Sequence, residues 1–249
     1  MTHLELSRRL EAAAPSVVPY LTAGFPDMPG FLGHLSSLAA IAPAIEVGIP
    51  FSDPMADGAT IQESSQAALA SGVTLRAILD ELDRTEISTP LVAMTYLNPL
   101  LAFGLEEVMA RFAGVGVAAL VIPDLPYEES AEVAGAAGSE SVGLVQLVTP
   151  ITDADRLETL CRVSEGFVYA VTMTGTTGSS VGDLTDIGAY LDRVRSYSAV
   201  PVLAGFGIRQ AAQVDLLTDH CDGVIVGSAI VELVARGEDP VPFVEGLKP

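Results

Sequence analysis

Short runs of apolar, often β-branched residues recur along the chain and alternate with segments of helical periodicity. Residues 45–49 show the alternation of a strand whose two faces differ, and comparable runs follow at intervals. Most successive runs begin 22 to 34 residues apart, which is the span of one strand and one helix. Eight strands are therefore predicted, at residues 16–23, 44–50, 90–96, 118–124, 143–149, 167–173, 201–207 and 223–229.

The segments between these runs favour amphipathic helices, for example residues 153–165 and 210–220. The second and third strands begin 46 residues apart, which leaves room for two helices, at 59–72 and 74–85. Alternating strands and helices predict a parallel sheet, and eight such units predict a closed (β/α)₈ barrel, with an open doubly wound sheet as the alternative. Because no segment resembles a linker, residues 1–249 are expected to form one domain that begins with a short helix.

An acidic residue interrupts the second strand. Ile45, Val47 and Ile49 share the face expected to meet the helices, so Glu46 points into the barrel. Active sites of this fold lie at the carboxyl ends of the strands, where the loop with Asp53 and Asp57 begins. A carboxylate buried there needs either a polar partner or a chemical task.

Composition excludes several classes of function. The 249 residues include 32 acidic and 12 basic ones, a net charge of −20 that argues against nucleic acid as a partner. No apolar run reaches the roughly 18 residues of a membrane helix, and the first residues lack the apolar block of a signal peptide, so a cytoplasmic protein is expected. Lys248 is the only lysine, and the three histidines lack metal-ligand spacing. A Schiff-base lysine and a metal site are therefore not expected.

Glycine-rich turns follow the last three strands, at residues 174–178, 204–208 and 226–230. Loops at this place in a barrel often bind phosphate, because glycine lets backbone N–H groups approach the anion. Gly227 and Ser228 precede a good helix, whose positive end would face the ligand. None of the three turns contains Lys or Arg, so a cradle of backbone N–H groups is the expected phosphate site.

Six segments, in order, resemble the tryptophan synthase alpha chain family. They are PYLTAGFPD (19–27), IEVGIPFSDPMADGATIQ (45–62), MTYLNP (94–99), IPDLPYEES (122–130), GFGI (205–208) and GVIVGSAIV (223–231). The resemblance covers almost the whole chain, and the second segment is highly specific. It implies a lyase that cleaves indole-3-glycerol phosphate to indole and glyceraldehyde 3-phosphate by a retro-aldol route.

The resemblance also implies roles for individual residues. Glu46 and Asp57 match the two catalytic carboxylates, with Glu46 moving protons and Asp57 staying ionised beside the indole N–H. Thr177 matches the loop threonine that accompanies closure. The residues that match the indole pocket are Tyr20, Ile61, Tyr96, Leu97 and Tyr169, and those that match the phosphate site are Gly178, Gly205, Phe206, Gly207, Gly227 and Ser228.

The family works with a β subunit, in an α2β2-type heterotetramer, and segments at Asp53, Asn98 and Pro126 match those that face it. Pyridoxal phosphate is expected only on that partner, and no cofactor or metal on this chain. Thr176 departs from the family pattern, as does the short C-terminal helix. Three alternatives stay open: a lyase that works alone, a barrel that mainly activates its partner, and a different phosphate-sugar enzyme such as an isomerase.

Overall fold

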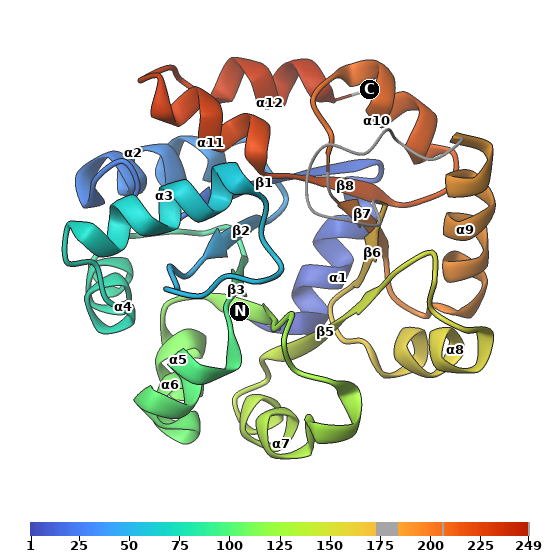
Figure 1. The fold of residues 1–249 in the computed structure, drawn as a ribbon, viewed down its shortest axis with the longest axis horizontal. Coiled ribbons are helices and arrows are strands. Elements are labelled where there is room, and N and C mark those ends of the chain that lie inside the picture. Colours follow the sequence, from blue (N-terminus) through green and yellow to red (C-terminus); the bar gives the residue numbers. More distant parts are fainter. Residues whose placement is uncertain (173–183, 206, 249) are drawn as a thin grey trace.

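The computed structural model describes residues 1–172, 184–205 and 207–248. Eight parallel strands close into a barrel in the order of the sequence, with β8 paired to β1, and the helices form a ring around them (Figure 1). The (β/α)₈ barrel is confirmed, and the open sheet is wrong. The strands are β1 (Ser16–Thr22), β2 (Ile45–Gly48), β3 (Leu91–Met94), β4 (Val117–Val121), β5 (Gly143–Val148), β6 (Val168–Val171), β7 (Val202–Gly205) and β8 (Gly223–Val226).

The helices follow the strands in turn, and the long interval after β2 holds two of them, as predicted. The helices are α1 (His3–Ala12), α2 (Met28–Ala39), α3 (Ala59–Ala70), α4 (Leu75–Asp83), α5 (Leu97–Phe103), α6 (Leu105–Gly114), the 3₁₀ helix η1 (Tyr127–Glu129), α7 (Ala131–Ser139), α8 (Ala154–Val163), α9 (Leu184–Tyr197), α10 (Ala211–Thr218), α11 (Ser228–Ala235) and α12 (Val241–Leu247). No helix in the described part of the chain combines the length and apolarity needed to span a membrane.

Local sequence explains where several helices begin. Asp27 accepts a hydrogen bond from the N–H of Gly30 at the start of α2, and Thr74 accepts one from Ala77 at the start of α4. α5 has no such cap of its own. The carboxylate of Asp124, in the loop after β4, accepts its first N–H, that of Leu97, at 2.9 Å. The loops after β3 and β4 are thereby tied together at the barrel mouth.

The core has two layers, one on each face of the barrel wall. Ile45 and Val47 belong to the outer layer, between strands and helices, whereas Ala44 belongs to the layer inside the barrel. This confirms the faces predicted for β2 and the inward direction of Glu46. Leu6 and Leu10 of α1 join the inner layer, because α1 lies across the end of the barrel opposite the active-site loops, within the ring of helices (Figure 1).

Several strands end earlier than the apolar runs suggest. β3 ends at Met94, so Tyr96 occupies the N-cap position of α5 and Leu97 is already helical. β8 ends at Val226, because Ser228 begins α11. The remaining residues of these runs belong to the starts of helices. Hydrophobicity alone does not distinguish a buried first helical turn from the end of a strand.

Candidate active site at the barrel mouth

Glu46 is the most deeply buried carboxylate of the barrel mouth. It is 1% exposed, lies beside Tyr20 of the neighbouring strand, and its Oε1 meets no hydrogen-bond partner among the described residues. Burial raises the pKa of Glu46 to about 8, and the Asp57 carboxylate adds to the increase. A pKa raised this far favours the protonated form of Glu46 at neutral pH, and no Tyr or Thr among the described residues bonds to its Oε1.

Asp57 lies in the loop between β2 and α3 and is 8% exposed. The hydroxyl of Tyr96 donates to its Oδ2 at 3.1 Å and accepts the N–H of Ala56 at 2.9 Å. Burial raises the pKa of Asp57 to about 6, and the hydrogen bond from Tyr96 opposes that increase. Asp57 does not cap α3, whose N-cap is Gly58. Its side chain is instead held as an ionised acceptor beside a protonated Glu46.

Three of the five residues predicted for the indole pocket lie together. Tyr20, Ile61 and Tyr169 belong to the apolar cluster inside the barrel. Tyr96 lies outside this cluster, bonded to Asp57 and stacked on Phe51 with ring centroids 5.0 Å apart. The fifth, Leu97, is half-buried and packs against the outer core, so the structure does not bring its side chain to the others.

Two glycines make room for the aromatic rings. A Cβ added to Gly48 would lie 1.9 Å from Oη of Tyr20, and one added to Gly205 would lie 2.3 Å from Cε1 of Tyr169. Atoms cannot approach so closely, and each ring therefore occupies space that only a glycine on the adjacent strand leaves free.

The elements predicted to bind phosphate converge on the same end of the barrel. Gly205 ends β7, and Gly207 has φ = +85°, a conformation that favours glycine. Gly227 occupies the N-cap of α11 and makes no side-chain cap, so the helix presents its first N–H groups, from Ser228 onward, to an anion. Thr177, Gly178 and Phe206 lie outside the described residues.

The structure adds polar contacts that the sequence did not reveal. Arg209, directly after the turn at 204–208, forms a paired contact with Glu232 of α11, which also accepts from Thr60 of α3. The position of Arg209 beside that turn was a visible signal. Its partner was not, because residues 60, 209 and 232 are far apart in sequence. Thr22 and Ser64 are a similar case, with buried hydroxyl oxygens 2.7 Å apart that join β1 to α3.

The three segments predicted to face a partner follow β2, β3 and β4, in the loop before α3, in α5 and in the loop before η1. Asp53, Asn98 and Pro126 are all exposed. Each has a large exposed apolar neighbour, and these are Met55 at 76%, Leu101 at 52% and Tyr127 at 37%. The side chain of Asp53 accepts a hydrogen bond from Ser52 Oγ at 2.5 Å, within its own turn. These exposed apolar side chains all belong to segments that follow the carboxyl ends of strands, at the same end of the barrel as Glu46 and Asp57.

The described residues contain no group of His, Cys, Asp and Glu side chains arranged to hold a metal ion. Two cavities lie away from Glu46. One of about 380 Å³ lies between the loop after β4 and α8, and another of about 420 Å³ lies between α3 and α11. The carboxylate pair, rather than either cavity, is the candidate chemical centre, because burial raises the pKa of both acids.

Comparison with known proteins agrees with this geometry. The family model described as "Tryptophan synthase alpha chain" matches residues 6–242. The tryptophan synthase alpha chain of Oceanobacillus iheyensis is 39% identical over 237 residues, covering 94% of this chain and 90% of that protein. The alpha chain of Bacillus cereus is 40% identical over 243 residues, covering 96% and 94%.

Solved structures give the same result. The tryptophan synthase a2b2 complex from Pyrococcus furiosus contains a chain that is 37% identical, with a TM-score of 0.86 and coverage of 94% of this chain and 98% of that one. A Mycobacterium tuberculosis tryptophan synthase chain is 31% identical, with a TM-score of 0.88 and 98% coverage of both. The chain therefore belongs to the tryptophan synthase alpha chain family, whose members are lyases that cleave indole-3-glycerol phosphate in tryptophan biosynthesis.

Proposed function

We propose that Glu46 and Asp57 are the residues with which this chain cleaves indole-3-glycerol phosphate. The observation that carries the proposal is the difference between their environments. Burial keeps Glu46 protonated, with a pKa of about 8, whereas Tyr96 helps to keep Asp57 ionised, with a pKa of about 6. Two carboxyl groups whose pKa values are pushed apart serve as proton donor and fixed negative charge.

Each carboxyl group has a defined task in the reaction. Glu46 donates its proton to the indole ring carbon that carries the glycerol phosphate chain, and positive charge spreads to the ring N–H, where Asp57 stabilises it. The bond between the ring carbon and the chain then breaks, and its electron pair returns to the ring. Glu46, now a carboxylate, takes the proton of the adjacent hydroxyl, which becomes the aldehyde of glyceraldehyde 3-phosphate. The cycle leaves Glu46 protonated again and consumes no net proton.

The pocket supports this assignment at both ends of the substrate. The apolar cluster with Tyr20, Ile61 and Tyr169 suits an indole ring. Gly205, Gly207, Gly227 and Ser228 lie where a phosphate would meet backbone N–H groups. Thr177, Gly178 and Phe206 are assigned to the same site from the family resemblance alone. The side chain of Leu97 is not part of this pocket, and its backbone N–H donates to Asp124 at the start of α5.

The exposed loops around Asp53, Asn98 and Pro126 are assigned to a tryptophan synthase β subunit. Met55, Leu101 and Tyr127 give this surface an apolar character that suits a protein partner. The related Pyrococcus furiosus protein is described as an a2b2 complex with mutual activation, and we infer the same type of assembly here. Pyridoxal phosphate belongs to the β subunit in this proposal, and the α chain needs no cofactor of its own.

The test is indole release from indole-3-glycerol phosphate by the purified chain, without added metal or cofactor and with or without a β subunit. The proposal predicts measurable release by the chain alone and faster release with the partner. Release that is unchanged by the partner would instead indicate a self-sufficient lyase. No release in either case, together with activation of the partner, would indicate a barrel that only activates the β subunit and would overturn the proposal.

A further inference from the structure

A network of charged and polar groups links the loop after β7 with helices α3 and α11, beside the proposed phosphate site. Arg209, in the loop after β7, donates from Nη1 and Nη2 to the two carboxylate oxygens of Glu232, at 2.7 and 2.6 Å. Thr60, in the first turn of α3, donates to Oε1 of Glu232 at 3.3 Å. The position of Arg209 is itself fixed, because its N–H is bound by Gln213 of α10 at 2.8 Å.

The carboxylate of this network lies close to the place where an anion would bind. Glu232 follows Ser228 by four residues in α11, which is about 6 Å along the helix axis. Arg209 holds the pKa of Glu232 below its usual value, so Glu232 is negatively charged at neutral pH. Without a counter-charge, this carboxylate would repel a phosphate dianion at the N-terminus of the same helix and weaken the attraction of the helix dipole.

Arg209 supplies that counter-charge from the phosphate loop itself. Gly207 lies two residues before it, and the Arg209 side chain is 51% exposed whereas that of Glu232 is 32% exposed. A paired contact of this kind contributes little to stability, because both groups remain solvated. The pair can still affect the binding of a nearby anion. It is neutral as a whole, and loss of either member changes the local charge by one unit.

We propose that Arg209 and Glu232 form a specificity-determining ion pair that sets the affinity of this chain for phosphorylated substrates. Arg209 neutralises Glu232, and Glu232 in turn restrains Arg209 from binding the phosphate directly. The inference rests on the proposed function, because it takes the phosphate to lie at Gly207 and Ser228. Neither residue touches the reacting atoms, and both act on binding rather than on the chemical step.

The test uses single and double substitutions with opposite expected signs. Arg209→Gln leaves Glu232 unneutralised and should raise the KM for indole-3-glycerol phosphate by about three- to tenfold at low salt. Glu232→Gln frees Arg209 and should lower that KM, and glutamine keeps an oxygen acceptor for Thr60. The double variant should return near the original value, and kcat should change little in all three. Binding of an indole-propanol phosphate analogue should follow the same order.

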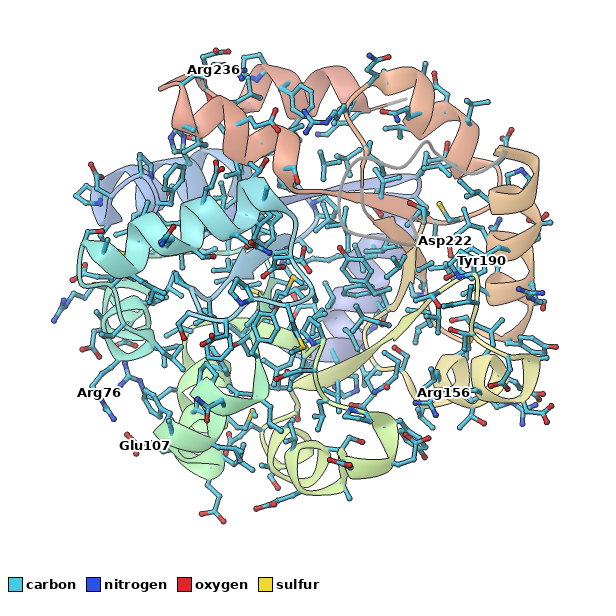
Figure 2. The ribbon with its side chains drawn as sticks, in the orientation of Figure 1. Arg76, Glu107, Arg156, Tyr190, Asp222 and Arg236 are labelled. Atoms are coloured by element: carbon cyan, nitrogen blue, oxygen red, sulfur yellow. The ribbon has the colours of Figure 1, made fainter. Side chains whose placement is uncertain are left out.

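The salt dependence of the KM is a second readout, because a purely structural contact would not make the effects of the substitutions depend on ionic strength. Raising the salt from about 0.02 M to about 0.5 M shortens the Debye length from roughly 20 Å to about 4 Å and should bring the affinities of all variants together. Arg76→Gln is the matched control. Arg76 pairs with Glu107 at 3.3 Å at the outer edge of the molecule, on the side away from α11 (Figure 2), so its loss should leave the KM nearly unchanged.

The inference is overturned if Arg209→Gln and Glu232→Gln move the affinity in the same direction, if the effects persist at high salt, or if Arg76→Gln has an equal effect. Ser228→Asp separates this failure from a failure of the proposed site, because it places a charge directly at the start of α11. If Ser228→Asp abolishes analogue binding but Arg209→Gln and Glu232→Gln do not shift the affinity in opposite directions, only the ion-pair proposal is wrong. If Ser228→Asp leaves binding intact, the phosphate lies elsewhere, and the proposed phosphate site fails together with the ion-pair proposal.

Discussion

At the scale of single residues, the site depends on two acids that the fold treats differently. Glu46 is buried and its Oε1 has no hydrogen-bond partner among the described residues, whereas Asp57 is nearly as buried but accepts a hydrogen bond from the Tyr96 hydroxyl. Burial disfavours the charged form of both, and the hydrogen bond restores it only for Asp57. The order of ionisation is therefore fixed by one tyrosine and by the face of β2 from which Glu46 projects.

This order predicts a bell-shaped dependence of kcat/KM on pH. Activity should rise with pH through about 6 as Asp57 ionises, and fall above about 8 as Glu46 loses its proton. The two limbs belong to the coupled pair, so they are read as apparent values. Tyr96→Phe removes the bond that lowers the Asp57 pKa, and the acid limb should move to higher pH while the alkaline limb stays. A profile that is flat from about pH 5 to about pH 9 would contradict the assignment.

At the scale of elements, neighbouring strands are matched to one another through glycine. Gly48 of β2 leaves the space that Tyr20 of β1 fills, with 1.9 Å between a hypothetical Cβ and the Tyr20 hydroxyl. Gly48→Ala should therefore displace the tyrosine ring and destabilise the barrel by about 1–3 kcal/mol, as overpacking of a filled core does. Denaturant unfolding measures the change, and the KM for indole-3-glycerol phosphate should rise with it.

Gly33→Ala is the control for that substitution. Gly33 lies within α2, and an added Cβ there would meet nothing within 4 Å. Alanine favours the helix over glycine by about 0.5–1 kcal/mol, so this variant should be slightly more stable than the original chain. Equal destabilisation by both substitutions would show that the Gly48–Tyr20 contact does not explain the effect.

The elements were the most predictable part of the molecule. Short apolar runs located all eight strands, and the alternation at residues 45–49 identified the inward face of β2 and hence Glu46. The boundaries were less predictable, since the apolar runs continue into helices at Tyr96 and Ser228. Contacts such as Tyr96–Asp57 and Arg209–Glu232 were not predictable, because the residues are distant in sequence and meet only when the barrel closes.

At the level of the whole molecule, the net charge of −20 contrasts with the exposed apolar side chains of Met55, Leu101 and Tyr127, which follow β2, β3 and β4. The turn that carries Asp53 leads directly to the catalytic loop. The carbonyl of Asp53 accepts the N–H of Met55 at 2.9 Å, and that of Pro54 accepts the N–H of Asp57 at 3.3 Å. A partner that binds this surface in one conformation would raise the population of that conformation in the loop.

Asp53→Ala tests whether this turn relays the partner's effect. The variant should retain nearly normal activity alone, because Asp53 touches neither Glu46 nor the proposed substrate pocket. Its stimulation by a saturating β subunit should be much reduced, as measured by indole release with and without the partner. Intact stimulation would mean that Asp53 only stabilises its own turn, in which its side chain accepts from Ser52.

Turnover of indole-3-glycerol phosphate by Glu46→Gln, measured beside the binding of an indole-propanol phosphate analogue, decides whether Glu46 transfers the proton. Glutamine keeps the size of the buried side chain but cannot donate and then retrieve a proton. We expect kcat to fall by at least about 10⁴-fold, at the upper end for loss of a general acid–base group, while the analogue still binds. A variant that turns over within about threefold of the original chain would contradict the account, because the reaction would then not depend on proton transfer by Glu46.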